Sequence, residues 1–175
     1  VFKQYYVNLY RDPTAQNRER TNRFVSRVGL SQITPEQGEE LEESIQLHKI
    51  RVAMNAIAKN KTPVMDRFSI EFYTTYEAIV APRLCEMYVE AFEMGRLPPS
   101  LEEALIVVLL KQGRDPLEVI SYSPLSMLNM DYKILSKVLA NRFLPLVSSL
   151  VHPDQNGFIP KRFTFSNIHR LCHIM

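Results

Sequence analysis

The chain has 175 residues, 46% of them hydrophobic, which is enough apolar material to bury a core and excludes a disordered tail. The longest apolar run, residues 104–110, is too short to cross a bilayer, and the N-terminus lacks a basic-then-apolar secretory pattern. A net charge of +2 does not by itself indicate a nucleic-acid partner, so the positions of the charges decide that question.

The two cysteines, Cys85 and Cys172, have no metal-ligand spacing and are too few for a disulfide framework. They favour a reducing, intracellular compartment, without distinguishing nucleus from cytoplasm. The sequence starts without an initiator methionine at Val1 and stops at Met175 without a closing element. We therefore expect both ends to lie inside a longer polypeptide.

The first 60 residues predict short helices with exposed charges. Residues 2–10 place aromatic side chains on one helical face, which predicts docking on a core. An acidic block and an amphipathic helix from Leu47 to Ile57, with Ser44 as its N-cap, follow. The charged side chains are expected to face solvent, or in the case of the arginines a polynucleotide: Arg11, Arg18, Arg20, Arg23, Arg27, Glu36, Glu39, Glu40, Glu42 and Glu43.

The middle of the chain predicts a helix and then a small hairpin. Apolar positions from Phe68 to Phe92 indicate a helix that is split or kinked at Pro82 and ends at Gly95, with its aromatic side chains in the core. The uniformly apolar run from residue 105 to 110 predicts a buried strand, which pairs with residues 123–127. The fold class is therefore predicted to be α+β, mostly helical.

The last third of the chain predicts an amphipathic helix with a basic stripe. Lys133, Lys137 and Asn141 recur at helical spacing on one face, while Leu135, Val138, Leu139 and Leu146 recur on another face. From residue 133 onward the cations are accompanied by Asp154 as the only carboxylate side chain. This asymmetry is typical of a protein that binds phosphates, and a solvated helix face is the alternative.

Three segments resemble the reverse transcriptase of LINE-type non-LTR retrotransposons. They are KNKTPVMDRFSIEFY, SYSPLSMLNMDYKILSKVLANR and VHPDQNGFIPKR. The family pattern has glycine where this chain has Val64, Arg67 and Lys161, proline at Leu110 and arginine at Ser123. Glycine readily adopts positive φ, so its replacement by these residues is expected to disfavour the loop conformation of the family.

The resemblance implies a partial right-hand polymerase fold, with fingers, a small β hairpin and the start of the palm. Residues 1–30 would be a connector, and residues 31–175 the N-terminal part of the polymerase domain, truncated before the catalytic aspartates. Lys111 and Arg162 would contact the nucleotide. Template contacts are expected from the remaining candidates: Lys133, Lys137, Asn141, Arg142, Gln155, Gly157 and Phe158.

Two of these candidates have simpler structural interpretations, since Gly157 also suits a turn and Phe158 also suits a core. The resemblance places Asp131 at a helix start and Asp154 in a turn, so we expect neither to bind a metal. Mg²⁺ is expected for the full-length enzyme and not for this fragment. The implied partners are an RNA template, a DNA primer and the rest of the polymerase palm.

The function predicted from these features is that of a fragment of a retrotransposon RNA-directed DNA polymerase that is inactive alone, since both catalytic Asp motifs of the family are missing. Residual RNA or single-stranded DNA binding is one alternative. A helical interaction protein, or a decayed reading frame without a selected role, is another. Because the palm would cover apolar surface, we also expect marginal stability and self-association.

Overall fold

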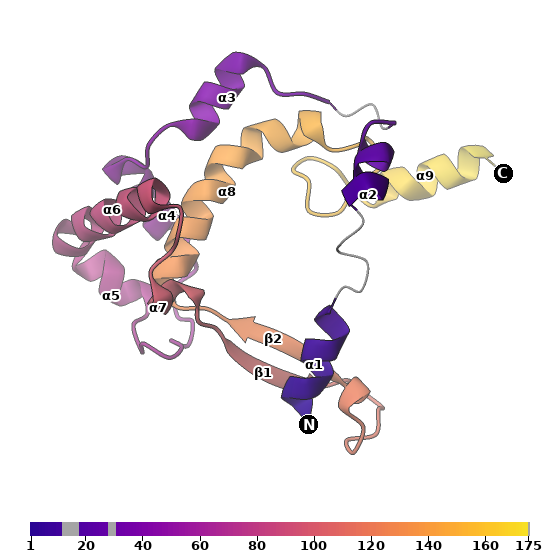
Figure 1. Ribbon diagram of the computed structural model, residues 1–175, viewed down its shortest axis with the longest axis horizontal. Helices are drawn as coiled ribbons and strands as arrows, with labels where there is room; N and C mark the ends of the chain where they lie inside the picture. The colour runs from indigo at the N-terminus through magenta and orange to yellow at the C-terminus, as the bar shows by residue number, and fades with distance from the viewer. Residues whose placement is uncertain (12–17, 28–30, 175) are drawn as a thin grey trace. The chain divides into compact units, whose positions relative to one another are not determined.

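The computed structural model describes residues 1–11, 18–27 and 31–174 (Figure 1). The chain separates into two compact units. The first unit consists of residues 1–30 and 105–127, and the second consists of residues 31–104 and 128–175. Arg18 and Arg20, for which solvent exposure was predicted, have side chains outside the described part of the structure.

The first unit contains a β hairpin with a helix against one strand. Helix α1 spans Phe2–Tyr10, helix α2 spans Arg18–Val25, strand β1 spans Leu105–Leu110, the 3₁₀ turn η1 spans Val119–Ser121, and strand β2 spans Tyr122–Met127. The ring of Phe2 meets that of Tyr122 edge-on at 5.1 Å, and the Tyr6 hydroxyl donates to the Tyr122 carbonyl at 3.3 Å. The predicted docking of this helix is thus confirmed for Phe2 and Tyr6, whereas Tyr10 is exposed.

The two strands pair antiparallel, with Leu105 opposite Met127 and Leu110 opposite Tyr122. The predicted hairpin is therefore confirmed. The predicted burial of its first strand is wrong, because Ile106 and Leu109 are 56% and 50% exposed. The apolar run has high β propensity and forms a strand. Its apolar composition does not ensure that other elements cover both faces of that strand.

The second unit is helical. Its elements are α3 (Pro35–Glu42), α4 (Leu47–Ala56), α5 (Ile70–Thr75), α6 (Glu77–Met94), α7 (Pro99–Glu102), α8 (Met130–Leu150) and α9 (Phe165–Ile174). Helix α3 begins with a capping box in which the Thr34 hydroxyl accepts from the Gln37 amide and the Gln37 side chain accepts from the Thr34 amide. Its glutamates are exposed, as predicted for a solvated acidic face.

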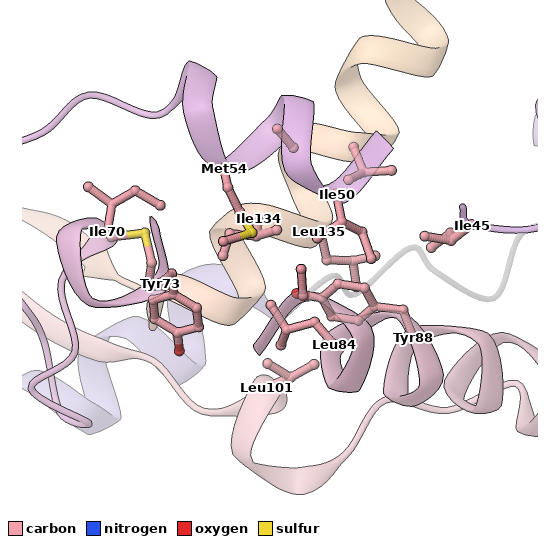
Figure 2. Close-up of a cluster of buried hydrophobic side chains, with 14 residues drawn as sticks. Ile45, Ile50, Met54, Ile70, Tyr73, Leu84, Tyr88, Leu101, Ile134 and Leu135 are labelled. Carbon is pink, nitrogen blue, oxygen red and sulfur yellow. The ribbon is translucent and has the colours of Figure 1, made fainter. Parts of the chain in front are cut away.

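The core lies where α4 packs against α6 and α8, with α5 beside them (Figure 2). Ile50, Met54 and Ile134 are fully buried in it. Tyr88 is also fully buried, and its hydroxyl donates to the Asp131 carbonyl at 2.7 Å. Burial raises the pKa of the Tyr88 phenol, so this ring stays neutral and links α6 to the first turn of α8.

Helix boundaries differ from the prediction at two places and agree with it at a third. The helix divides at Tyr76, not at Pro82, because Pro82 lies in the second turn of α6, where it removes only one intrahelical hydrogen bond. Helix α4 begins after Gln46 instead of Ser44. Gly95 ends α6 at φ 66°, as predicted.

The prediction that the aromatic side chains of this region lie in the core is confirmed for Tyr88. It is wrong for Phe92, which is 55% exposed. The fold is α+β and mostly helical, with a two-stranded sheet. Among the described residues, no helix is long and apolar enough to span a membrane.

Candidate nucleic-acid interface

Lys111 belongs to the first unit, where it follows β1 at the base of the hairpin loop. Its amide donates to the Ser121 carbonyl at 2.8 Å, and its ammonium group donates to the Ile120 carbonyl at 3.0 Å. Ser123 lies opposite Leu109. Since side chains alternate between the faces of a strand, positions 111 and 123 are diagonal neighbours on one face of the ribbon. A guanidinium at position 123 would adjoin the Lys111 ammonium, but here a hydroxyl occupies that place.

The predicted basic stripe lies on α8 in the second unit. Lys133, Lys137 and Asn141 are half-buried, and Ile134 and Val138 on the neighbouring face are buried in the core. Neither lysine forms an ion pair with a carboxylate of the described residues. Both positive charges therefore remain available to an external anion.

Arg142 is turned toward the connection between α3 and α4. Its Nη1 donates to the Leu41 carbonyl at 2.8 Å, while Nε and Nη2 are buried without an acceptor among the described residues. A hydrogen bond from Lys49, followed by the charges of Lys49 and Arg142, lowers the pKa of Glu43. Arg142 thus attaches α8 to the end of α3.

Asn141 and Arg142 also line a cleft of about 250 Å³ between α3, α4 and α8. Glu40, His48 and Lys49 contribute the other charged or titratable side chains of its wall. The cleft is of mixed charge, in contrast to the unpaired lysines nearer the start of α8.

Arg162 organises the loop that follows α8. Its Nη1 donates to the carbonyls of His152 and Gln155 at 2.7 and 2.9 Å, and its Nη2 donates to those of Ser148 and Val151 at 2.8 and 3.1 Å. The carbonyls of Ser148 and Val151 belong to the C-terminal end of α8, where a cation complements both the unpaired carbonyls and the helix dipole. The guanidinium is consequently engaged with its own backbone.

The loop geometry explains where the family pattern has glycine. Lys161 and Arg67, which both replace a glycine of that pattern, adopt left-handed backbone at φ 62° and 61°. Each of the two residues therefore adopts the left-handed conformation although it carries a side chain, at a cost of about 1–2 kcal/mol. Val64, the other replaced glycine, does not have a positive φ.

Phe158 is fully exposed and lies at φ 62° between the two ends of the loop. Its interpretation as a core aromatic is therefore wrong. Gly157 beside it does not have a positive φ, and a Cβ added there would meet only the Gln155 amide, at an ordinary 3.6 Å. The Gln155 amide in turn donates to the Gly157 carbonyl at 3.2 Å, which orders the chain just before the exposed ring.

Polar contacts also tie the loop to α9. Asn156 is only 7% exposed, and its amide donates to the Asn167 side chain. Asp154 pairs with Arg170 and lies 3.4 Å from His152 Nδ1. The burial of Asn156 could not be predicted, because one Asn in a polar turn carries no signal of burial.

Asp131 and Asp154 lie in separate surroundings. Burial raises the pKa of Asp131, whose carboxylate accepts the Tyr132 amide at 2.8 Å at the start of α8. Asp154 is engaged by Arg170 as described. Within the described ranges, no three His, Cys, Asp or Glu side chains gather in a metal-binding arrangement. The expectation that this fragment binds no Mg²⁺ stays a prediction.

No protein-family model matches the chain. It is 32% identical over 140 residues, or 80% of its length, to the transposon TX1 uncharacterized 149 kDa protein of Xenopus laevis. It is 25% identical over 136 residues, 75% of its length, to the RNA-directed DNA polymerase from mobile element jockey of Drosophila funebris. This chain is a relative of LINE-type retrotransposon proteins. The resemblance to non-LTR reverse transcriptases is thereby confirmed.

A further relative is the RNA-directed DNA polymerase from mobile element jockey of Drosophila melanogaster, 29% identical over 92 residues, or 51% of the chain. The chain spans only 11%, 14% and 10% of the length of these three relatives. The similarity therefore concerns a part of each mobile-element protein.

Proposed function

We propose that this chain is the part of a retrotransposon reverse transcriptase that holds the template strand, and that it binds single-stranded nucleic acid without polymerising it. The observation that carries the proposal is the pair of lysines on α8, Lys133 and Lys137, neither of which forms an ion pair with a carboxylate of the described residues. From residue 133 onward the chain has a single carboxylate side chain, that of Asp154, and the chain is similar to an RNA-directed DNA polymerase of a mobile element. Such a cationic stripe binds phosphates without reading sequence.

The loop after α8 supplies the second element of the proposal. Proteins that bind single strands combine cations with aromatic side chains on which bases stack. Phe158 is fully exposed in an ordered loop, and the exposed Lys161 lies three residues after it. In our proposal Phe158 stacks on a base, while Lys161 and the α8 lysines contact the backbone phosphates.

Arg162 has a different role in this proposal from the one implied by the resemblance. Because its guanidinium hydrogen-bonds four carbonyls of the loop and of α8, it positions Phe158 and Lys161 and does not contact the nucleotide. The resemblance implies that Lys111 contacts the nucleotide, and the proposal retains that role. Ser123 cannot supply the bidentate charge of an arginine, so nucleotide binding is expected to be weak.

The polymerisation chemistry is proposed to lie outside these 175 residues, because their five aspartates include no adjacent pair such as the Phe/Tyr-x-Asp-Asp motif of the family requires. Two-metal transfer depends on such carboxylates. With primed template RNA, nucleotides and Mg²⁺, the purified chain should give no extended primer. Metal-dependent extension would contradict this part of the proposal.

Binding is tested by fluorescence anisotropy with a labelled single-stranded RNA of mixed sequence. The logarithm of the affinity should fall linearly with the logarithm of salt concentration, with a slope of about −0.7 for each phosphate neutralised. The double variant K133Q/K137Q should reduce the steepness of that slope by about 1–2. The matched control K59Q/K61Q, which removes two exposed lysines after α4, should leave it unchanged. Affinity that does not respond to salt would refute the proposal.

A further inference from the structure

The hairpin of the first unit has one blocked and one open edge. Residues facing each other in an antiparallel pair alternate between hydrogen-bonded and non-hydrogen-bonded positions. The bond from the Lys111 amide to the Ser121 carbonyl sets that alternation for the whole hairpin. Counting along the register, Val108 and Pro124 form a non-hydrogen-bonded pair, so their backbone groups point to the outer edges.

The outer edge of β2 is blocked in two ways. Pro124 has no N–H to offer at the outward position, as is usual for proline in an edge strand. The outward carbonyl of Tyr122 already accepts the Tyr6 hydroxyl, and the ring of Phe2 lies against Tyr122. A further strand therefore cannot extend the sheet on this side.

The outer edge of β1 is open. By the same alternation, the N–H and C=O groups of Ile106, Val108 and Leu110 point away from β2, and no described residue hydrogen-bonds to them. The strand has the sequence Leu-Ile-Val-Val-Leu-Leu, without charge, glycine or proline. Short apolar segments of high β propensity at an unprotected edge readily pair with another strand.

We propose that β1 pairs with β1 of a second copy of this chain, forming a symmetric dimer with a continuous four-stranded antiparallel sheet. The twofold axis passes at Val108, so Val108 lies opposite its copy and Ile106 lies opposite Leu110 of the other chain. This register places every outward-pointing residue of β1 in a hydrogen-bonded pair. It also brings β-branched and leucine side chains together across the strands.

The blocked edge explains why the assembly closes at two chains. In the dimer both outer edges are β2 strands, each carrying Pro124 and the Tyr6 contact. A symmetric interface of this kind is closed, whereas two open edges would allow chains to add indefinitely. The same segment would otherwise be an aggregation site.

Sedimentation velocity of the full chain tests the proposal first. The native chain should sediment with twice the monomer mass. Val108→Pro removes the outward N–H without removing a bond between β1 and β2, so it should abolish the dimer. Val108→Thr keeps the N–H and the branched shape, so it should retain the dimer. A monomeric native chain, or a dimer that survives Val108→Pro, would overturn the proposal.

Cross-linking gives a second measurement that does not depend on how proline is tolerated. In a background with Cys172→Ser, Val108→Cys places two thiols across a hydrogen-bonded pair, where Cα atoms lie about 5.5 Å apart, within disulfide range. The matched Val107→Cys places them diagonally at about 7–8 Å and on the other face. Mild oxidation should yield a covalent dimer at least tenfold faster for position 108. Equal rates, or faster cross-linking at 107, would overturn the register.

Discussion

The helical core and the loop after α8 are ordered by different forces. Around α4, α6 and α8, buried side chains such as Ile50, Met54 and Ile134 exclude water, so that apolar area removed from solvent supplies most of the stability. Residues 151–164 bury little apolar surface, and their shape depends on the carbonyl bonds of Arg162. The loop side chains proposed to bind nucleic acid thereby stay exposed while the loop itself is ordered.

The difference predicts that core and loop respond to different substitutions. The largest effect is expected from Ile134→Ala, which removes a fully buried side chain between α4 and α8. It should lower the free energy of unfolding by about 2–4 kcal/mol in urea denaturation followed by circular dichroism. The exposed Ser136→Ala on the same helix should change it by less than about 0.5 kcal/mol.

Arg162→Lys should act on the loop more than on the core. An ammonium group cannot serve the carbonyls of Ser148, Val151, His152 and Gln155 from one planar fork, so a loss of about 1–2 kcal/mol is expected. Limited proteolysis should cleave the loop faster while the helical signal is retained. Arg170→Lys, which changes only the ion pair with Asp154, is the control. Equal cleavage of the two variants would contradict the assignment.

Lys161→Gly should stabilise the chain, because glycine adopts the left-handed conformation without the clash of a Cβ. The gain is expected to be about 1 kcal/mol at most, since glycine also loses more chain entropy on folding. Lys161→Ala removes the same charge but keeps the clash, so it should not be stabilising. Thermal denaturation at fixed salt distinguishes the two.

Asp131→Asn should have the smallest effect, and that effect should depend on pH. Burial raises the pKa of this carboxyl in the folded chain, so its contribution to stability is fully present below its unfolded pKa and is lost as pH rises through the folded value. The amide avoids that loss. Asp131→Asn should therefore raise the melting temperature at pH 7 and not near pH 4, and the opposite order would refute the assignment.

Helices and strands followed from local patterns in the sequence. The spacing of Leu135 and Val138 gave the buried face of α8, and the apolar run at residue 105 gave β1. Boundaries governed by hydrogen bonding, such as the division at Tyr76, did not follow, because periodicity does not report which amide pairs with which carbonyl.

The candidate site was predictable by position and less so by role. Lys133 and Lys137 share the expected helical face. Arg142 was expected to contact the template and Arg162 the nucleotide, and in the structure each donates to backbone carbonyls. An arginine that binds phosphate and one that caps a helix look alike in sequence, and only the position of nearby carbonyls distinguishes them.

The exposed aromatic ring at the loop tip gives the most direct test of template binding. Phe158→Ala should weaken binding of single-stranded RNA by about 1–3 kcal/mol in anisotropy at fixed salt, as expected for one lost stacking contact. Phe163→Ala removes another exposed ring nearby and should leave the affinity nearly unchanged. Equal affinities for the native chain and Phe158→Ala would contradict the proposal that this loop contacts the template.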